Sequence, residues 1–284
     1  MKHGFLKRFF SVLRFDTHTF LFRFFEINSE RMCNNKVRTL DEETRKIILS
    51  EDERFHHKDM ILEELGSQYV VRGFTVDRIR FLRECGITPD EIIMDIGDSN
   101  GIFIRSLKNE GISLNISPGV ALSLRDKNIE TVIADAEYLP FKDRSISTIL
   151  LFQTLEHVPN PVRLLKEIGR VCKKSLILSI PYVSETHIHK RQYDLQRPIY
   201  EHHIFEFSQP DFRSIVSHTP FTIAREMNAV VLDNRGFSAD KILIRIWNYL
   251  FEPDQFCGCF MKFYLVHLKK TEDPEIFPEQ RRTG

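Results

Sequence analysis

The sequence predicts an α/β protein in which a doubly wound, mostly parallel sheet follows an N-terminal helical extension. From Gly66 onward, short apolar runs alternate with segments of helical periodicity, a pattern typical of a parallel sheet covered by helices. A glycine turn, residues 95–101, follows the first of these runs, and Asn160 before Pro161 marks a helix start. These observations predict one main domain over residues 66–272.

The composition fits a chain that buries a large core. Hydrophobic residues make up 42% of the 284 residues, and 40 basic residues balance 40 acidic ones. No overall positive charge marks the chain as a nucleic-acid binder, so no nucleic-acid partner is expected. The five cysteines are odd in number and mostly scattered, unlike a disulfide framework, which favours a cytoplasmic setting.

The first 65 residues are expected to form helices, since phenylalanines recur at helical spacing. Within them, residues 1–25 mix Phe with Lys and Arg. They contain neither the roughly 18 apolar residues of a spanning helix nor a small-residue signal cleavage site. Two alternatives stay open for this segment: peripheral contact with a membrane, or packing on the protein as a lid or oligomer contact. Residues 273–284 are expected to form a C-terminal tail.

The elements are predicted in order along the chain. Five strands are expected at residues 91–96, 113–116, 131–134, 146–152 and 175–180. Helices are expected at residues 102–107, with Gly111 as a stop signal, at 118–124, and from Pro161 onward. The buried face of this last helix is predicted to comprise Val162, Leu165, Ile168 and Cys172. Further elements are a helix at 211–218, a strand at 221–232, a helix at 241–250 and a strand at 259–268.

The glycine turn is the first candidate functional feature. In a doubly wound sheet, ligands bind beyond the carboxyl ends of the strands, where a glycine loop lets the backbone approach them. Residues 95–101 occupy this position after the first strand. The pair Gly97 and Gly101 is equally explained by a purely structural turn, so the turn needs support from other motifs.

That support comes from two stretches, DAEYLPF at residues 135–141 and LLFQTLEHVPNPVRLLKEIGRV at residues 150–171. They resemble the central part of the small class I S-adenosylmethionine-dependent methyltransferases. The resemblance covers about residues 91–182, with a weaker echo at EHHIFEFSQPDF, residues 201–212. It implies S-adenosylmethionine as cofactor. It also implies a Rossmann-like, seven-stranded sheet ending in an antiparallel hairpin, to which the last two predicted strands correspond.

The resemblance also implies a set of cofactor-binding residues, some of which depart from the family pattern. The family's D-x-G-x-G-x-G loop falls on Asp95, with Ser99 in place of the middle glycine. Asn115 stands where the family has an acid for the ribose hydroxyls, and it offers a hydrogen bond without charge assistance. The full implied set is Asp95, Gly97, Ser99, Gly101, Asn115, Asp135, Ala136, Phe152 and Gln153. In the family, Asp135 would lie near the adenine amino group, and the last two residues would border the methionine portion.

Histidines supply the candidates for acid–base chemistry. Methyl transfer depends on positioning the acceptor, with a base needed only when the acceptor carries a proton. We consider five histidines, each of which could equally be structural: His157, His187, His189, His202 and His203. Of these, His157 and His202 are the predicted catalytic residues. No metal is expected, because the His187-x-His189, His202-His203 and Cys257-x-Cys259 spacings match no standard zinc pattern.

The predicted function is methyl transfer from S-adenosylmethionine to a small-molecule, sugar or lipid-linked acceptor. The alternative is a catalytically degenerate member of the fold that serves as a binding or scaffold module, which the changes at Ser99 and Asn115 favour. A nicotinamide dehydrogenase ranks third, since the loop lacks the G-x-G-x-x-G pattern. Cofactor binding separates the first two alternatives.

Overall fold

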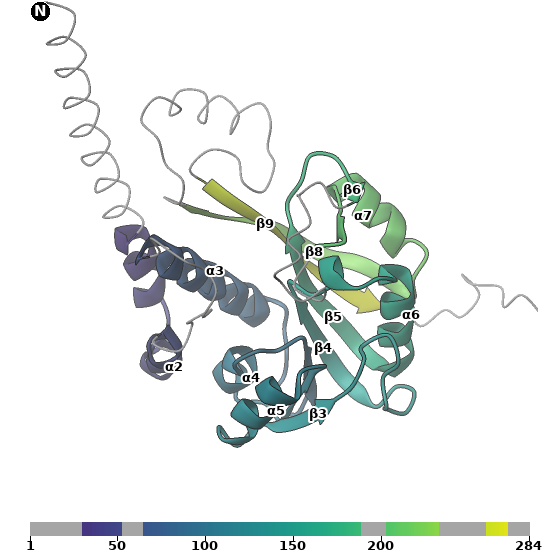
Figure 1. Cartoon of the computed structure of the whole chain (residues 1–284), viewed down its shortest axis with the longest axis horizontal. Coiled ribbons are helices and arrows are strands. Elements are labelled where there is room, and N and C mark those ends of the chain that lie inside the picture. The colour runs from purple at the N-terminus through teal and green to yellow at the C-terminus, as the bar shows by residue number, and fades with distance from the viewer. Residues whose placement is uncertain (1–29, 53–64, 189–202, 233–259, 272–284) are drawn as a thin grey trace, which may run out of the picture. The chain divides into compact units, whose positions relative to one another are not determined.

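The computed structural model describes residues 30–52, 65–188, 203–232 and 260–271 (Figure 1). Its helices are α2 (Glu42–Asp52), α3 (Leu65–Glu84), α4 (Ile102–Leu107), α5 (Pro118–Arg125), α6 (Pro161–Val171) and α7 (Gln209–Val216), with a 3-10 turn η1 (Leu155–His157). Its strands are β1 (Ile93–Ile96), β2 (Gly111–Asn115), β3 (Glu130–Ile133), β4 (Ile146–Phe152), β5 (Cys172–Pro181), β6 (His187–Ile188), β7 (Phe205–Glu206), β8 (Phe221–Leu232) and β9 (Phe260–Lys270).

Seven of these strands form one mixed sheet in the order β3-β2-β1-β4-β5-β9-β8. Strands β1 to β5 pair in parallel, whereas β9 runs antiparallel to β5. Strands β2 and β3 lie on one side of β1, and β4 and β5 lie on the other, so the strand order reverses between β1 and β4. A ligand crevice in such a sheet lies at this switch point, beyond the carboxyl ends of the strands. The predicted doubly wound, Rossmann-like fold is confirmed.

Burial on both faces explains why the central strands read as continuous apolar runs. Every residue of β1 and of β4 is buried, because α4 and α5 cover one face of the parallel sheet and α6 covers the other (Figure 1). Neighbouring β5 joins the same core through Leu176 and Leu178. The sheet thereby holds the β1–α4 turn and the β4–η1 turn at one rigid edge.

Helix α6 begins where the sequence predicts it. The Asn160 side chain accepts a hydrogen bond from the Arg163 backbone N–H at 3.1 Å, and Pro161 occupies the first turn. The predicted buried face was wrong at Val162, which is 36% exposed; Cys172 is buried as predicted, but it caps α6 and begins β5. The buried side chains follow the i, i+3, i+4, i+7, i+10 spacing from the first helical residue: Pro161, Leu164, Leu165, Ile168 and Val171.

Most predicted boundaries hold within two or three residues, and some shift for local reasons. Helix α4 ends at Leu107 because Lys108 adopts φ 61°, so Gly111 starts β2 and is not the helix stop. Helix α7 begins two residues earlier than predicted, because the Ser208 side chain caps it by accepting from the Asp211 N–H. The predicted helix at 241–250 lies outside the described residues, as does the Phe-rich segment 1–25.

The chain divides into two compact units, Met1–Asp77 with Ala229–Lys262 and Arg78–Asn228 with Phe263–Gly284. In the first unit, residues 30–38 are helical and an ion pair of 2.5 Å joins Lys36 to Asp77. The candidate site described below belongs to the second unit alone. Among the described helices, none combines the length and the apolar character that crossing a membrane requires.

Candidate functional site

The turn after β1 requires glycine at two positions. Gly97 has φ 81°, and a Cβ there would lie 2.3 Å from the Thr154 Oγ1. Gly101 has φ 71°, and a Cβ there would lie 1.9 Å from the Ile129 Cδ1. Ser99, in contrast, is exposed and is not among the residues of positive φ. Serine therefore replaces the family's middle glycine at a position where the backbone imposes no left-handed conformation.

The Asp98 side chain holds this turn together by hydrogen bonds to its backbone. One of its carboxylate oxygens accepts hydrogen bonds from the backbone N–H groups of Asn100 (3.0 Å) and Gly101 (2.7 Å). Lys127 donates to the Asn100 carbonyl at 2.9 Å and ties the turn to the end of α5. Burial raises the pKa of Asp98, while the two N–H groups oppose that rise. The turn is thus held together by hydrogen bonds to its own buried carboxyl group.

Asn115 connects the turn to the end of β2. Its side-chain amide donates to the Asp98 carbonyl at 2.7 Å, and its side-chain oxygen accepts from the Ser117 N–H at 2.9 Å. The sequence places this residue where the resemblance expects a ribose ligand, and the structure shows that it already orients two loops. A ribose would share the amide with the Asp98 carbonyl or bind to the remaining lone pair of the side-chain oxygen.

Asp95 adds a second buried carboxylate at the end of β1. The residue is 2% exposed, and among the described residues its Oδ2 has no hydrogen-bond partner. Burial raises its pKa well above the ordinary value of 3.8; the Asp98 charge adds to the rise, and the Arg78 guanidinium opposes it. An acid held in this way favours a positively charged or hydrogen-bond-donating ligand.

Apolar side chains stand exposed beside the turn, at the carboxyl ends of β2 and β3. Ile116 is 58% exposed and Ile133 is 49% exposed. Asp135 follows β3, is exposed, and accepts the Glu137 N–H at 2.9 Å, whereas Ala136 packs partly buried on the core. Exposed aliphatic groups next to a polar acceptor suit a flat heteroaromatic ring with an amino group.

The end of β4 presents an aromatic and cationic group. Phe152 is buried and packs on Phe103 with ring centroids 4.6 Å apart. The Arg78 guanidinium lies over both rings, 5.4 Å from the Phe152 centroid and 5.8 Å from that of Phe103. Gln153 adopts φ 50°, and its side chain donates to the Ser179 hydroxyl at 3.3 Å. This unusual backbone marks the point where β4 turns into η1.

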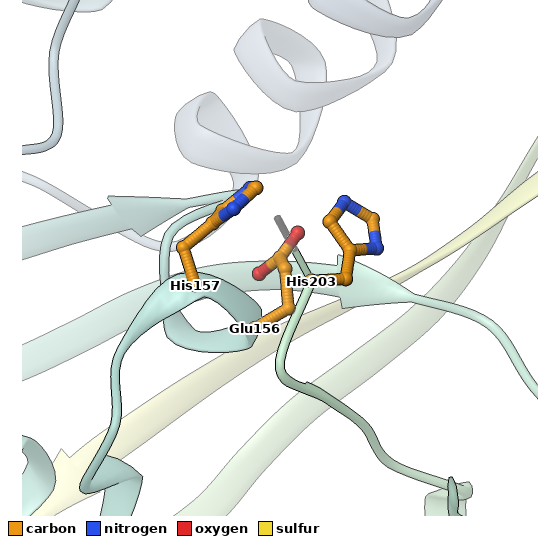
Figure 2. A group of neighbouring side chains, drawn as sticks. All are labelled: Glu156, His157 and His203. Carbon is orange, nitrogen blue, oxygen red and sulfur yellow. The ribbon is translucent and has the colours of Figure 1, made fainter. Parts of the chain in front are cut away.

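Three side chains that could bind a metal ion or a proton meet beside the turn that follows β4. Figure 2 shows the Glu156 carboxylate between the imidazoles of His157 and His203. One ligand atom from each residue lies within 4.8 Å of the others, and the two rings meet edge to face at 4.7 Å. The Ile204 N–H donates to the Glu156 carbonyl at 2.7 Å, which brings the two chain segments together. Below, these three residues are called the Glu-His-His cluster.

Burial dominates the electrostatics of Glu156. The residue is 0% exposed, and among the described residues neither of its carboxylate oxygens has a hydrogen-bond partner. Burial raises its pKa to about 7, with the Glu206 charge adding to the rise and the positive charges of His203 and Arg78 opposing it. A group with this pKa can hold or release a proton near neutral pH.

Comparison with known proteins identifies a methyltransferase domain in the chain. Residues 94–180, from β1 to β5, match a family described as a methyltransferase domain. The fold resembles a candidate sarcosine dimethylglycine methyltransferase from Galdieria sulphuraria, with a TM-score of 0.53 and 15% identity over 80% of this chain and 99% of that one. It also resembles a candidate methyltransferase from Bacillus halodurans, with a TM-score of 0.51 and 15% identity over 69% of this chain and 99% of that one. The fold is that of the class I methyltransferases.

Sequence relatives match the methyltransferase domain over shorter stretches. An uncharacterised protein of Methanocaldococcus jannaschii is 37% identical over 89 residues, which cover 31% of this chain and 35% of that protein. A demethylmenaquinone methyltransferase of Corynebacterium glutamicum is 24% identical over 123 residues, which cover 40% of this chain and 54% of that protein. The matched part therefore spans between about a third and just over half of these relatives.

The methyltransferase domain brings the predicted cofactor residues to one edge of the sheet. Asp95, Gly97, Ser99 and Gly101 line the β1 turn, and the others follow β2, β3 and β4. Of the predicted catalytic pair, His157 lies in the Glu-His-His cluster, and His202 lies outside the described residues. The same holds for other residues whose spacing was compared with zinc patterns: His189, Cys257, Cys259 and the side chain of His187 also lie outside the described part.

Sequence reasoning missed three residues of this edge. Glu156 is the most prominent, and its position between an apolar strand end and His157 was the available signal. Asp98 was visible in the turn but had no role there without the backbone bonds that the fold reveals. Arg78 precedes the first predicted strand by more than ten residues, so nothing local linked it to Phe152.

Proposed function

We propose that the methyltransferase domain binds S-adenosylmethionine and transfers its methyl group to a small-molecule, sugar or lipid-linked acceptor. The observation that carries this proposal is the pair of buried acids, Asp95 and Asp98, at the glycine turn. S-adenosylmethionine bears a sulfonium and an ammonium group, whose positive charges such acids attract. A phosphate-bearing dinucleotide would instead place its anionic groups against two carboxyl groups at this turn.

The residues at the sheet edge fit the parts of this cofactor. Asp95 has an unused carboxylate oxygen for a donor group, and the glycine turn permits close backbone approach. Ile116, Ile133 and Asp135 provide the apolar and acceptor groups that an adenine needs. Phe152 and Gln153 would border the methionine portion. When bound, the cofactor supplies an electrophilic methyl group on sulfur.

The protein's own task is to position the acceptor, exclude water and remove the acceptor's proton. We place the last step at the Glu-His-His cluster, where imidazole nitrogens of His157 and His203 lie next to a buried carboxylate. The cluster follows β4, one strand away from the glycine turn that follows β1. Adjacent carboxyl ends of parallel strands thus present cofactor and acceptor chemistry side by side.

A second candidate function is a scaffold that keeps the fold without the reaction. The observation favouring it is Asn115, whose amide and side-chain oxygen both bond within the protein. An acid at this position would hold the ribose hydroxyls with charge assistance, and the neutral amide weakens that contact. Cofactor affinity is therefore the property that separates the two candidates.

The experiment is titration calorimetry of the full chain with S-adenosylmethionine and with S-adenosylhomocysteine. Asp95→Ala and Asp135→Ala test the two ends of the proposed site. Asp126→Ala, an exposed acid at the end of α5, is the matched control and should bind like the unaltered chain.

Saturable binding at micromolar affinity that is lost in Asp95→Ala and weakened in Asp135→Ala would support the methyltransferase. It would also justify a screen of hydroxyl- and amino-bearing acceptors. If the chain melts cooperatively, and is therefore folded, but releases no heat of binding with either ligand, the scaffold function would be the better explanation.

A further inference from the structure

The Glu-His-His cluster combines the donor atoms that divalent metal ions prefer. Imidazole nitrogen and carboxylate oxygen are ligands of Zn²⁺, Mn²⁺, Fe²⁺ and Co²⁺, and two histidines with one carboxylate are a recurrent open metal site. Within the described residues, this is the one place where three such side chains converge. They come from two segments, η1 and the residue pair before β7, which the Ile204-to-Glu156 backbone bond holds together (Figure 2).

The spacing of the ligand atoms is close to what one ion needs. Ligands bound at about 2.1 Å in a tetrahedral or octahedral shell lie roughly 3 to 3.5 Å from their neighbours. Each cluster residue offers an atom within 4.8 Å of the others. Side-chain rotations that move the three ligand atoms inward by about 1 Å would bring them to these separations.

Glu206 supplies the outer contact that metal-binding histidines usually make. Its carboxylate lies 2.6 Å from the Nδ1 of His203, and it comes from β7, three residues further along the chain. A carboxylate on Nδ1 fixes the tautomer, aims the opposite nitrogen and raises its basicity as a ligand. Glu206 thereby assigns the ligand role to the Nε2 of His203.

Buried charge gives the independent reason for a cation. Glu156 is fully buried, yet within the described residues neither carboxylate oxygen accepts a hydrogen bond. Burying a carboxylate without such partners is unfavourable unless a proton or a cation compensates it. Arg78 is one positive group near Glu156, but Glu206 adds a second negative charge.

We propose that Glu156, His157 and His203 bind a divalent transition-metal ion, with Glu206 orienting His203. Three protein ligands leave at least one coordination position for a water or a substrate oxygen. This step rests on the proposed function: if the domain transfers a methyl group, the metal site favours an acceptor that is methylated on a hydroxyl oxygen. The ion would bind that oxygen and lower its pKa, so that the cluster removes the acceptor's proton through the ion and the proton leaves to water. The oxygen would then bond to the methyl carbon as the carbon–sulfur bond of the sulfonium breaks and S-adenosylhomocysteine leaves.

The test begins with cation binding alone, so it does not depend on the cofactor or the acceptor. The full chain, without a histidine tag, is stripped with a chelator, dialysed and titrated with Zn²⁺, Co²⁺, Mn²⁺ and Mg²⁺. The absorption spectrum of bound Co²⁺ reports nitrogen and oxygen coordination. We expect one Zn²⁺ or Co²⁺ per chain and weaker binding of Mg²⁺, because imidazole favours the transition metals.

Variants locate the ion. Glu206→Gln should weaken binding about 10- to 100-fold, and Glu156→Gln or His203→Ala should weaken it further. Glu156→Gln is isosteric, and thermal melting checks that each variant folds. The control is His218→Ala, which removes an exposed histidine after α7 and should leave binding unchanged.

Two outcomes would overturn the site. One is a folded chain that binds none of the four cations with saturation. The other is an ion retained at full affinity by Glu156→Gln and His203→Ala, which would place it on other residues. S-adenosylmethionine binding, measured separately, reports on the proposed function, so the two ideas fail or stand independently.

Discussion

Substitution of Gly97 by alanine probes the turn on which the proposed site depends. The added Cβ meets the Thr154 Oγ1 at 2.3 Å and the Thr154 Cγ2 at 3.1 Å, and the backbone stays at φ 81°. Thr154 has little freedom to yield, because its hydroxyl donates to the carbonyls of Ile96 (3.3 Å) and Phe152 (3.1 Å). The substitution therefore combines backbone strain with a steric clash.

Both contributions can be given a magnitude. A left-handed conformation costs a residue with a Cβ about 1 to 2 kcal/mol, and forcing an extra methyl group into a packed site costs about 1 to 3 kcal/mol. We expect Gly97→Ala to lower the free energy of unfolding by about 2 to 5 kcal/mol. Thr154→Ala removes the clashing atoms, so the double variant should recover the steric part and keep the backbone strain.

Urea unfolding of the four proteins in this double-mutant cycle measures the effect. The predicted coupling energy between the two positions is about 1 to 3 kcal/mol in favour of the double variant. A Gly97→Ala protein within 0.5 kcal/mol of the unaltered chain would refute the reasoning, because the turn would then have room for a side chain. If the free-energy changes of the two substitutions simply add, Thr154 is not the neighbour that excludes a side chain at position 97.

Three further predictions concern the same domain. Burial raises the pKa of Asp95 in the folded protein above its ordinary value of 3.8, so ionisation at higher pH favours the unfolded chain. Asp95→Asn removes this ionisation, so its stability relative to the unaltered chain should increase as pH rises above 3.8. Urea midpoints from pH 4 to 8 test this, and a gap that does not widen with pH contradicts it. Asn160→Ala should cost about 1 kcal/mol and lower the Tm by roughly 2 to 4 °C through loss of the α6 cap; an unchanged melting curve would mean that the cap contributes nothing. Arg170→Ala should cost about 2 kcal/mol, because its guanidinium bonds the Leu139 and Phe141 carbonyls as well as the Glu167 carboxylate; unfolding within 0.5 kcal/mol of the unaltered chain would contradict that role.

Elements with strong local signals could be predicted from the sequence. Asn160 and Pro161 define the start of α6 through a cap and a fixed backbone angle, and both signals are local. Continuous apolar runs identified β4 and β5, because strands buried on both faces tolerate few polar residues. The order of these elements, together with the resemblance, was enough to predict the fold class and the sheet edge that carries the turn.

The remaining features depend on contacts between distant segments. Glu156 and His203 are 47 positions apart in the sequence, and only the pairing of η1 with the segment before β7 brings them together. The role of Asn115 was equally hidden, since its partner is the Asp98 carbonyl, 17 positions earlier. Val162 shows a different limit: it lies on the edge of the α6 apolar face, where periodicity alone does not decide burial.

The most direct measurement is a crystal structure of the full chain grown with saturating S-adenosylhomocysteine. We expect the ligand beyond the carboxyl ends of β1, β2 and β3, with its backbone contacts in residues 97–101 and its adenine near Ile116, Ile133 and Asp135. A well-ordered turn that stays free of ligand at saturation would contradict the claim that this domain is a methyltransferase and favour the scaffold.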